Sequence, residues 1–311
     1  MIRVPFLPRA ERREKATPSR AERGIVSATD WQRRRVRWTL WAIQGGTLLF
    51  LLIAGLGPLL WMAKSSITPT QDTLRMPMAL WPNGFDLSFF VTAWTRTHID
   101  RYLLNTVWIA VGSWLVQIVV ATTAGYALSV LRPRFSRVLT GLVLATLFVP
   151  SIVLLVPLYL TVVNMPVLHL RLIDTFWAVW LPAGASAVNV ILIKRFFDNL
   201  PREIFEAAQV DGAGPFRLFW SVVLPMSRPI LGVVSVFAVI ATWKDYLWPL
   251  LVLRDPASQP LSVRLPTLQA STPLDIFLAA LTISTLIPIA LFLLFQRMFL
   301  RGAGLSGAIK G

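Results

Sequence analysis

The chain of 311 residues contains no cysteine, which excludes disulfide bonds, thiolate metal sites and cysteine nucleophiles. Charged residues are also scarce, at 14%, whereas 55% of the residues are hydrophobic and 13 are tryptophan. A soluble domain of this length does not need so much apolar surface. The composition therefore indicates an integral membrane protein.

Motifs for catalysis and nucleotide binding are missing as well. The sequence has no Walker A pattern, no HExxH, no nucleophile elbow and no carboxylate pair at a useful spacing. His98 and His169 are isolated in predicted loops. We therefore expect a protein that is not an enzyme and has no catalytic residues, cofactor or metal site. If the protein moves a solute against its concentration gradient, the energy would have to come from an ion gradient or from another subunit.

Six apolar runs are long enough to cross about 30 Å of hydrocarbon. The predicted transmembrane spans cover residues 38–63, 103–131, 138–163, 176–197, 229–253 and 276–298. A basic arm (1–37) precedes them, a polar loop (198–228) separates the fourth span from the fifth, and a short tail (299–311) follows. Ala121 and Gly125 in the second span allow close approach of another helix, and Pro150 and Pro157 predict a broken or bent third span.

Charge is distributed unevenly about these spans. Because six spans place both termini on one side, the arm, the turn at 132–137, residues 194–228 and the tail together with Arg297 at the end of the sixth span lie on the same side, with 22 of the 30 Lys and Arg residues and 8 of the 15 acidic residues. The positive-inside rule makes this side, with a net charge of +14, the cytoplasm. The basic composition thus reflects topology and not nucleic-acid binding, and we expect the arm to contact anionic membrane lipid.

The stretch 201–225 interrupts two apolar runs and predicts a helix-turn-helix at the membrane face. Pro201 suits a first helical turn, and Glu203 lies at the positive end of the helix dipole. Small and apolar residues follow, offering a face on which another surface could lie. Gly212 then permits a left-handed turn, and Pro215 restarts a helix that Leu224-Pro225 ends.

Within this stretch, Glu206-Ala207-Ala208, then Gly212 and the later Leu224-Pro225 resemble the EAA motif of permeases from bacterial ATP-binding-cassette (ABC) importers. Further segments are similar to the carbohydrate-uptake subfamily, the type of the second maltose permease subunit. They are Asn105-Thr106, Phe148-Val149-Pro150, Trp243 to Pro249 and Arg301 to Gly311. The resemblance covers the chain from about Trp38 onward.

The resemblance implies an all-α integral membrane protein with six transmembrane helices, the type I ABC importer permease fold and a cytoplasmic coupling helix. Its partners would be a second permease subunit in a heterodimer, two ABC ATPase subunits that hydrolyse ATP, and an extracytoplasmic solute-binding protein. The solute would be a sugar or oligosaccharide, and the location the bacterial inner membrane with both termini cytoplasmic. The ATPase-docking residues would be Glu206, Ala207, Ala208, Asp211, Gly212, Leu224 and Pro225.

One segment could line the translocation pathway: Trp243, Lys244, Asp245, Tyr246 and Trp248. Its aromatic rings could stack on sugar rings; alternatively, it forms an outer aromatic belt with charges that reach the headgroups. A rise of about 1.5 Å per residue from Pro229 places Lys244 beyond the midplane, which favours the belt. The subfamily usually has an uncharged amide where Lys244 stands.

Two rival functions remain at this point. An ion-coupled secondary transporter or channel would carry ionisable residues inside its spans, but Lys244 and Asp245 are the only deep candidates, and we find no inverted repeat. An intramembrane enzyme would need a nucleophile, metal ligands or a carboxylate pair, and the predicted spans contain none.

Overall fold

Every regular element is a helix in the computed structural model, which describes residues 33–82 and 84–304. The α-helices are α2 (Arg34–Ser65), α3 (Thr70–Arg75), α4 (Ser88–Arg96), α5 (Ile99–Tyr126), α6 (Ser136–Thr146), α7 (Ser151–Val163), α8 (Trp177–Ala183), α9 (Ala187–Asp198), α10 (Arg202–Val210), α11 (Pro215–Leu218), α12 (Leu224–Met226), α13 (Arg228–Lys244), α14 (Leu247–Val252), α15 (Leu261–Ser271) and α16 (Leu274–Gly304). Two π-helical turns are η1 (Ala127–Leu131) and η2 (Phe219–Val223). The predicted all-α fold class is confirmed.

The chain divides into two compact units, Met1–Leu59 and Leu60–Gly311. The described part of the first unit belongs almost entirely to α2, which contains the predicted span 38–63 and begins at Arg34. The predicted arm before residue 33 lies outside the described residues. All packing discussed below belongs to the second unit.

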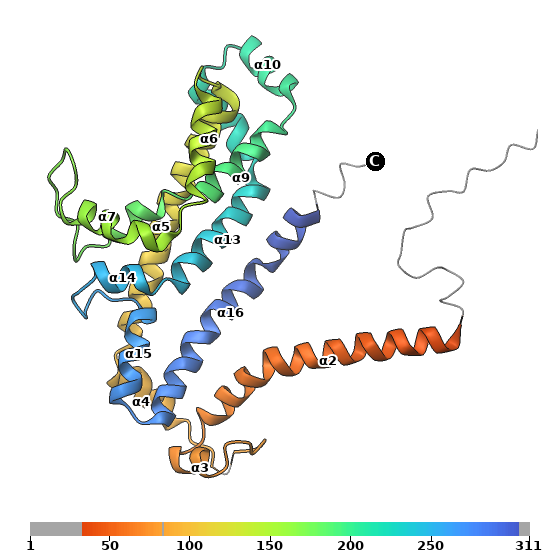
Figure 1. Ribbon diagram of the computed structural model, residues 1–311, viewed down its shortest axis with the longest axis vertical. Helices are drawn as coiled ribbons and strands as arrows, with labels where there is room; N and C mark the ends of the chain where they lie inside the picture. The colour runs from red at the N-terminus through yellow and green to blue at the C-terminus, as the bar shows by residue number, and fades with distance from the viewer. Residues whose placement is uncertain (1–32, 83, 305–311) are drawn as a thin grey trace, which may run out of the picture. The chain divides into compact units, whose positions relative to one another are not determined.

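Helix α5 runs through the second unit and takes part in three buried clusters (Figure 1). Tyr102 joins α4, α15 and α16, Ile109 joins α7, α8 and α14, and Ala121 joins α9, η2 and α13. The buried positions of α5 recur every three or four residues from Ile99 to Tyr126 and form one face of the helix, whereas Leu104 and Val119 are exposed. The remaining helices are therefore positioned mainly through their contacts with α5.

The predicted close approach at Ala121 and Gly125 is present between α5 and α9. Ala121 is 1% exposed, and a Cβ atom added at Gly125 would lie 2.9 Å from the side chain of Ile193. Two turns away, the amide of Asn189 donates to Gln117 at 2.7 Å, with both groups buried. Because Gly125 has no Cβ, α5 and α9 approach closely, and the buried side chains of Gln117 and Asn189 can form their hydrogen bond.

Several predicted spans consist of bent pairs of helices. By length and composition, α2 and the continuous helix Ile99–Leu131 could each cross a membrane, whereas α6 with α7, α8 with α9, and Pro215–Met226 with α13 qualify only as pairs bent by 106°, 43° and 78°. The described residues thus hold two such helices, or up to five if each pair is one span. The count of six spans stays a prediction.

The bend in the predicted third span occurs at Pro150, which caps the start of α7, whereas Pro157 lies inside that helix. The predicted fifth span, 229–253, is not one helix. α13 ends at Lys244, Asp245 is extended, and α14 begins at Leu247. The backbone N–H of Trp248 points to the carboxylate of Asp245 at 3.4 Å, so a polar side chain marks the new helix start.

Polar side chains of α5 hold the segment 257–261 in place. Asn105 donates to the carbonyls of Ala257 and Gln259 at 2.8 and 3.0 Å. The hydroxyl of Thr106 accepts from the N–H of Leu261 at 2.8 Å, where α15 begins. Asn105-Thr106, which the sequence analysis singled out only by its similarity to the carbohydrate-uptake subfamily, therefore fixes the segment 257–261 to α5.

Three helices lie in segments that were predicted as loops. α3 and α4 fall within residues 64–102, and α15 lies between the predicted fifth and sixth spans. Ala93 of α4 and Leu261 of α15 are buried in one cluster with α5 and α16. Helix α16 also continues to Gly304, beyond the predicted end of the sixth span at Met298.

Candidate functional site

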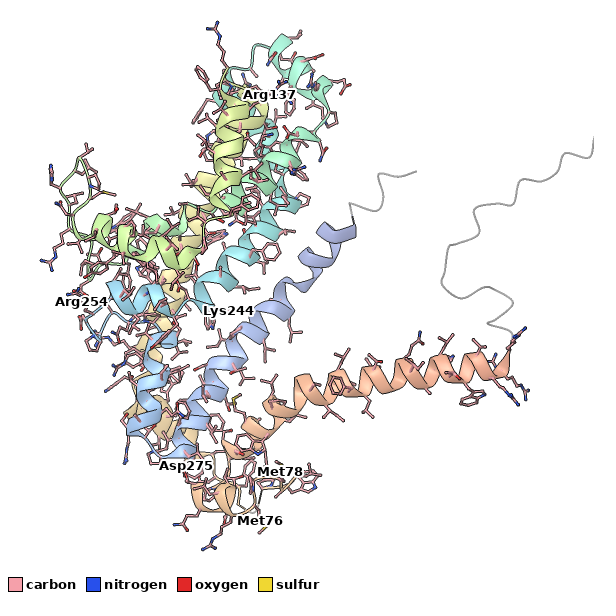
Figure 2. All side chains as sticks on the ribbon, in the orientation of Figure 1. Met76, Met78, Arg137, Lys244, Arg254 and Asp275 are labelled. Carbon is pink, nitrogen blue, oxygen red and sulfur yellow. The ribbon has the colours of Figure 1, made fainter. Side chains whose placement is uncertain are left out.

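The stretch 201–225 forms the predicted helix-turn-helix, built from α10, α11 and η2. Figure 1 shows α10 at the opposite end of the second unit from α3, α4 and α15, and Figure 2 shows Arg137 at the α10 end. Pro201 caps α10, and Glu203 lies in its first turn, as expected. α10 is thus a short, separate helix at one end of the unit.

Gly212 ends α10 in the manner that its sequence predicts. Its φ is +78°, and it is the only glycine with positive φ among the described residues. The N–H of Gly212 donates to Gln209 at 3.0 Å, and the N–H of Ala213 donates to Ala208 at 2.9 Å. This pattern is a Schellman motif, in which a left-handed residue satisfies the last carbonyls of a helix. The turn is therefore specified by backbone geometry and closed by two hydrogen bonds.

The two faces of α10 have different surroundings. Phe205 and Ala208 are half-buried and pack against the cluster that α5, α9, η2 and α13 share. Glu206, Ala207 and Val210 are exposed. Phe205 and Ala208 therefore support α10 from inside the chain, because the 3.6-residue period turns them away from Glu206. The docking role of Ala208 and of the other predicted docking residues stays a prediction. The exposed face combines two carboxylates, of Glu203 and Glu206, with a small residue and an isolated valine.

Tyr126 connects the segment after the turn to α5. Its hydroxyl donates to the carbonyl of Pro215 at 2.8 Å, and its ring lies 5.0 Å from that of Phe219. The start of α11 is therefore held on the same helix that α9 contacts. α10 is thus held at both ends, by the end of α9 and by the start of α11.

The second helix ends at Met226, one residue beyond the predicted end at Leu224-Pro225. η2 continues into α12, and the chain turns by 78° after Met226. Pro225 has no N–H to bond to the carbonyl four residues earlier, which accounts for a widened π turn immediately before it. Ser227 lies at the bend, is fully buried and donates its hydroxyl to Val223 at 2.6 Å.

The pathway candidates are not brought together on one surface. Trp248 is only 8% exposed, and its indole N–H donates to Ala178 at 3.0 Å within the cluster of α7, α8 and α14. Trp248 is therefore packed inside the chain, and its role in the pathway stays a prediction. Lys244 and Tyr246 are exposed, whereas Trp243 and Asp245 are half-buried. No ion pair joins Lys244 to Asp245 in the described part of the chain.

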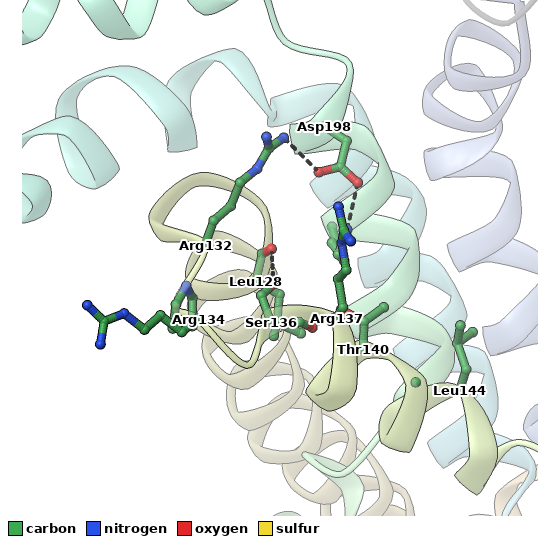
Figure 3. Close-up of a pocket in the computed structure, with 11 residues that line it drawn as sticks. Leu128, Arg132, Arg134, Ser136, Arg137, Thr140, Leu144 and Asp198 are labelled. Atoms are coloured by element: carbon green, nitrogen blue, oxygen red, sulfur yellow. Dashed lines mark hydrogen bonds and ion pairs between the residues drawn. The ribbon is translucent and has the colours of Figure 1, made fainter.

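A polar cluster beside α10 was missed by the sequence analysis. Asp198, the last residue of α9, pairs with Lys194 at 2.7 Å and with Arg132 at 3.8 Å (Figure 3). It also accepts a hydrogen bond from Ser129 at 2.7 Å. The four-residue spacing of Lys194 and Asp198 was a usable signal for a helical pair. Their meeting with η1 depends on tertiary packing. The cluster fixes the end of α9 just before α10 begins.

None of these groups forms a centre for chemistry. Within residues 33–82 and 84–304, no three His, Asp or Glu side chains gather in a way that could hold a metal ion. The exposed part of the site is a short helix with two carboxylates on a rigid base. Such a surface can bind a groove lined by basic side chains.

Comparisons with known proteins identify a family and several similar chains. The family described as "Binding-protein-dependent transport system inner membrane component" matches residues 117–303. The probable ABC transporter permease protein YurM of Bacillus subtilis is 32% identical over 92% of this chain and 94% of its own length. The arabinooligosaccharides transport system permease protein AraQ of Halalkalibacterium halodurans is 30% identical over 84% of this chain and 94% of its own.

A third relative is the sn-glycerol-3-phosphate transport system permease protein UgpE of Yersinia pestis, 34% identical over 76% of this chain and 84% of its own. A solved structure of a bacterial ABC transporter involved in the import of the acidic polysaccharide alginate has a chain with the same fold. Its TM-score is 0.73, at 22% identity over 88% of this chain and 99% of that one. This chain therefore belongs to the family of inner membrane components of binding-protein-dependent transport systems, the permease subunits of ABC transporters.

Proposed function

We propose that this chain is a permease subunit of an ATP-driven importer for a sugar or oligosaccharide, and that α10 is the helix through which the ATPase moves it. A separate ATPase subunit hydrolyses ATP, and an extracytoplasmic binding protein delivers the solute. The named solutes of two relatives, arabinooligosaccharides and sn-glycerol-3-phosphate, support a small carbohydrate or a related polar compound. A solved relative was crystallised with an alginate-bound periplasmic protein, which supports delivery by such a partner.

The main support for this role of α10 is that one side of the helix is exposed while the other side packs on the rest of the chain. Glu203, Glu206 and Ala207 are exposed on one side of the helix, while Phe205 and Ala208 rest on a close-packed cluster on the other. A partner that binds the exposed side can transmit its motion to the cluster beneath α10, because the Schellman turn and the Tyr126 hydrogen bond restrain independent movement of the far end of the helix. Ala207 permits close approach, and the two glutamates can meet basic side chains.

In the proposed topology, α10 and both termini face the cytoplasm, and six spans cross the inner membrane. The charge distribution supports this orientation, since the α10 side carries most of the Lys and Arg residues. A second permease subunit completes the pathway. Lys244 and Tyr246, exposed near the break between α13 and α14, remain candidates to contact the solute.

Gly212→Val tests the role of α10. A Cβ at position 212 would meet nothing within 4 Å, so the substitution acts through the backbone alone, where φ is +78°. A β-branched residue in this conformation costs about 1–3 kcal/mol and should displace α10. We expect Gly212→Val to insert in the membrane and assemble with the second permease, but to lose the ATPase on copurification and to lose solute uptake.

Matched variants separate the effect of the left-handed backbone at Gly212 from the effect of added side-chain volume nearby. Gly214 also has free space around it, but its φ of −68° and ψ of 168° suit valine, so Gly214→Val should keep the ATPase. Gly212→Asn should retain more of it than Gly212→Val, because asparagine tolerates the left-handed region. Glu206→Ala should weaken binding by about 1 kcal/mol or less. Full uptake by Gly212→Val with the ATPase retained would refute the proposal.

A further inference from the structure

We propose that the basic pocket between η1, α6 and α9 binds the phosphate of an anionic phospholipid in the cytoplasmic leaflet. The pocket has a volume of about 730 Å³ and is lined by Leu128, Arg132, Pro133, Arg134, Ser136, Arg137, Thr140, Gly141, Leu144, Lys194 and Asp198 (Figure 3). The leaflet follows from the proposed orientation of the chain, but binding itself does not depend on transport.

The charge of the pocket is strongly unbalanced. It contains three arginines and one lysine but a single carboxylate, that of Asp198. Asp198 is shared between Lys194 and Arg132. Neither Arg134 nor Arg137 has an ion pair with any residue that the structure describes. An anion is thus the ligand that this group of side chains favours.

The backbone of the pocket is fixed before any ligand arrives. Arg132 has a φ of +47° and donates its N–H to Ala127 at 3.0 Å, closing the π turn. Its Nε donates to Ser129 at 2.6 Å. The hydroxyl of Ser136, at the start of α6, donates to Leu128 at 2.8 Å. These bonds tie the turn 132–136 to η1, so the three arginines are presented from an ordered segment.

Apolar surroundings favour a lipid over a free anion. Phe135, Val138 and Leu142 are 71%, 60% and 59% exposed, and all three lie in or beside the predicted third span. Within the pocket, Gly141 and Leu144 follow along α6 from the basic end. A phospholipid matches both parts, with its phosphate among the arginines and its acyl chains along the exposed apolar side chains. Basic pockets between helices at the cytoplasmic interface bind anionic headgroups in this way.

The test measures lipid binding to the purified complete transporter. Phosphatidylglycerol and phosphatidylcholine with identical acyl chains are titrated separately in detergent, and bound lipid is counted by native mass spectrometry. We expect phosphatidylglycerol to bind more tightly. The double variant Arg134→Gln/Arg137→Gln should weaken it about tenfold or more, since each basic residue near an anionic lipid contributes to affinity.

Two further variants separate charge from shape and from general effects. Gly141→Leu fills the pocket without altering its charge, and a Cβ there meets nothing within 4 Å, so it should also weaken phosphatidylglycerol binding. Arg96→Gln/Arg171→Gln removes two exposed charges outside the pocket and should leave binding unchanged. All variants must give the same monodisperse complex as the parent chain.

Each other outcome overturns the proposal. Equal binding of phosphatidylglycerol by the parent chain and both pocket variants would exclude a headgroup site here. Competition by inorganic phosphate, with no preference for the intact lipid, would identify a free-anion site. Unchanged lipid binding with loss of the ATPase in the arginine variant would identify a protein interface. In all three cases the Gly212 experiment can still succeed, so failure here is distinct from failure of the proposed function.

Discussion

The hydroxyl of Tyr126 and the carbonyl of Pro215 lie 2.8 Å apart, joined by a hydrogen bond across 89 positions of sequence. This bond links α5, the helix shared by all three buried clusters, to the first residue of α11. Because Gly212 lies just before Pro215, the bond also limits how far the end of α10 can move. Tyr126 therefore supports the helix-turn-helix 201–225, although it does not lie within it.

Tyr126→Phe should lower the free energy of unfolding by about 1 kcal/mol, since it removes one hydrogen bond and retains the ring contact with Phe219. It should also reduce the ATPase activity that solute and binding protein stimulate. Thermal unfolding of the detergent-solubilised complex and its stimulated ATPase rate check both effects. Tyr102→Phe is the matched control, because Tyr102 is also buried on α5 and its hydroxyl forms no hydrogen bond with any residue that the structure describes. Equal losses in the two variants would contradict the role of the Tyr126 bond.

Trp248 should affect stability and not solute selectivity. Trp248→Phe removes the indole hydrogen bond to Ala178, and Trp248→Ala should cost about 3–5 kcal/mol through the cavity left in the cluster of α7, α8 and α14. Thermal unfolding should therefore occur at a lower temperature, more strongly for alanine. Competition between solutes in an uptake assay should be unchanged for Trp248→Phe. Altered selectivity would place Trp248 in the translocation pathway.

The proposed orientation can be checked with single cysteines in this cysteine-free chain. Val210 and Leu80 are 87% and 89% exposed, so their intrinsic accessibility is matched. In intact cells that produce this chain without its ATPase, Leu80→Cys should react with a membrane-impermeant thiol reagent. Val210→Cys should react only after the membrane is permeabilised. Labelling of Val210→Cys from outside would invert the topology.

Local signals predicted the helix-turn-helix well. Pro201, Glu203 and Gly212 act through rules that operate within one helical turn, and each occupies the expected place. The predicted fifth span is not one continuous helix, and the reason is different. Its apolar run continues through residue 253, but Asp245 interrupts the backbone and α14 begins again behind it. Hydropathy averages over such a break, because it ignores where the backbone hydrogen bonds are made.

Contacts between distant segments could not be predicted from one sequence. Nothing in the spacing of Ser129 and Asp198 indicates that they meet at 2.7 Å, since this depends on how α5 and α9 pack. The burial of Phe205 and Ala208 was likewise hidden, because a small or apolar residue on an amphipathic helix can serve a partner or its own core. Resemblance to a family identified the segment but not the division of its faces.

The cluster beneath α10 has a mechanical consequence. Phe205 and Ala208 rest on buried side chains from α5, α9, η2 and α13, among them Phe197, Val223 and Val234. Close-packed interiors have low compressibility and transmit strain, so a push on α10 is not absorbed where it arrives. In the proposed function, such a push reaches several helices at once and moves them together. Softening that cluster, and not only detaching the ATPase, would therefore uncouple hydrolysis from transport.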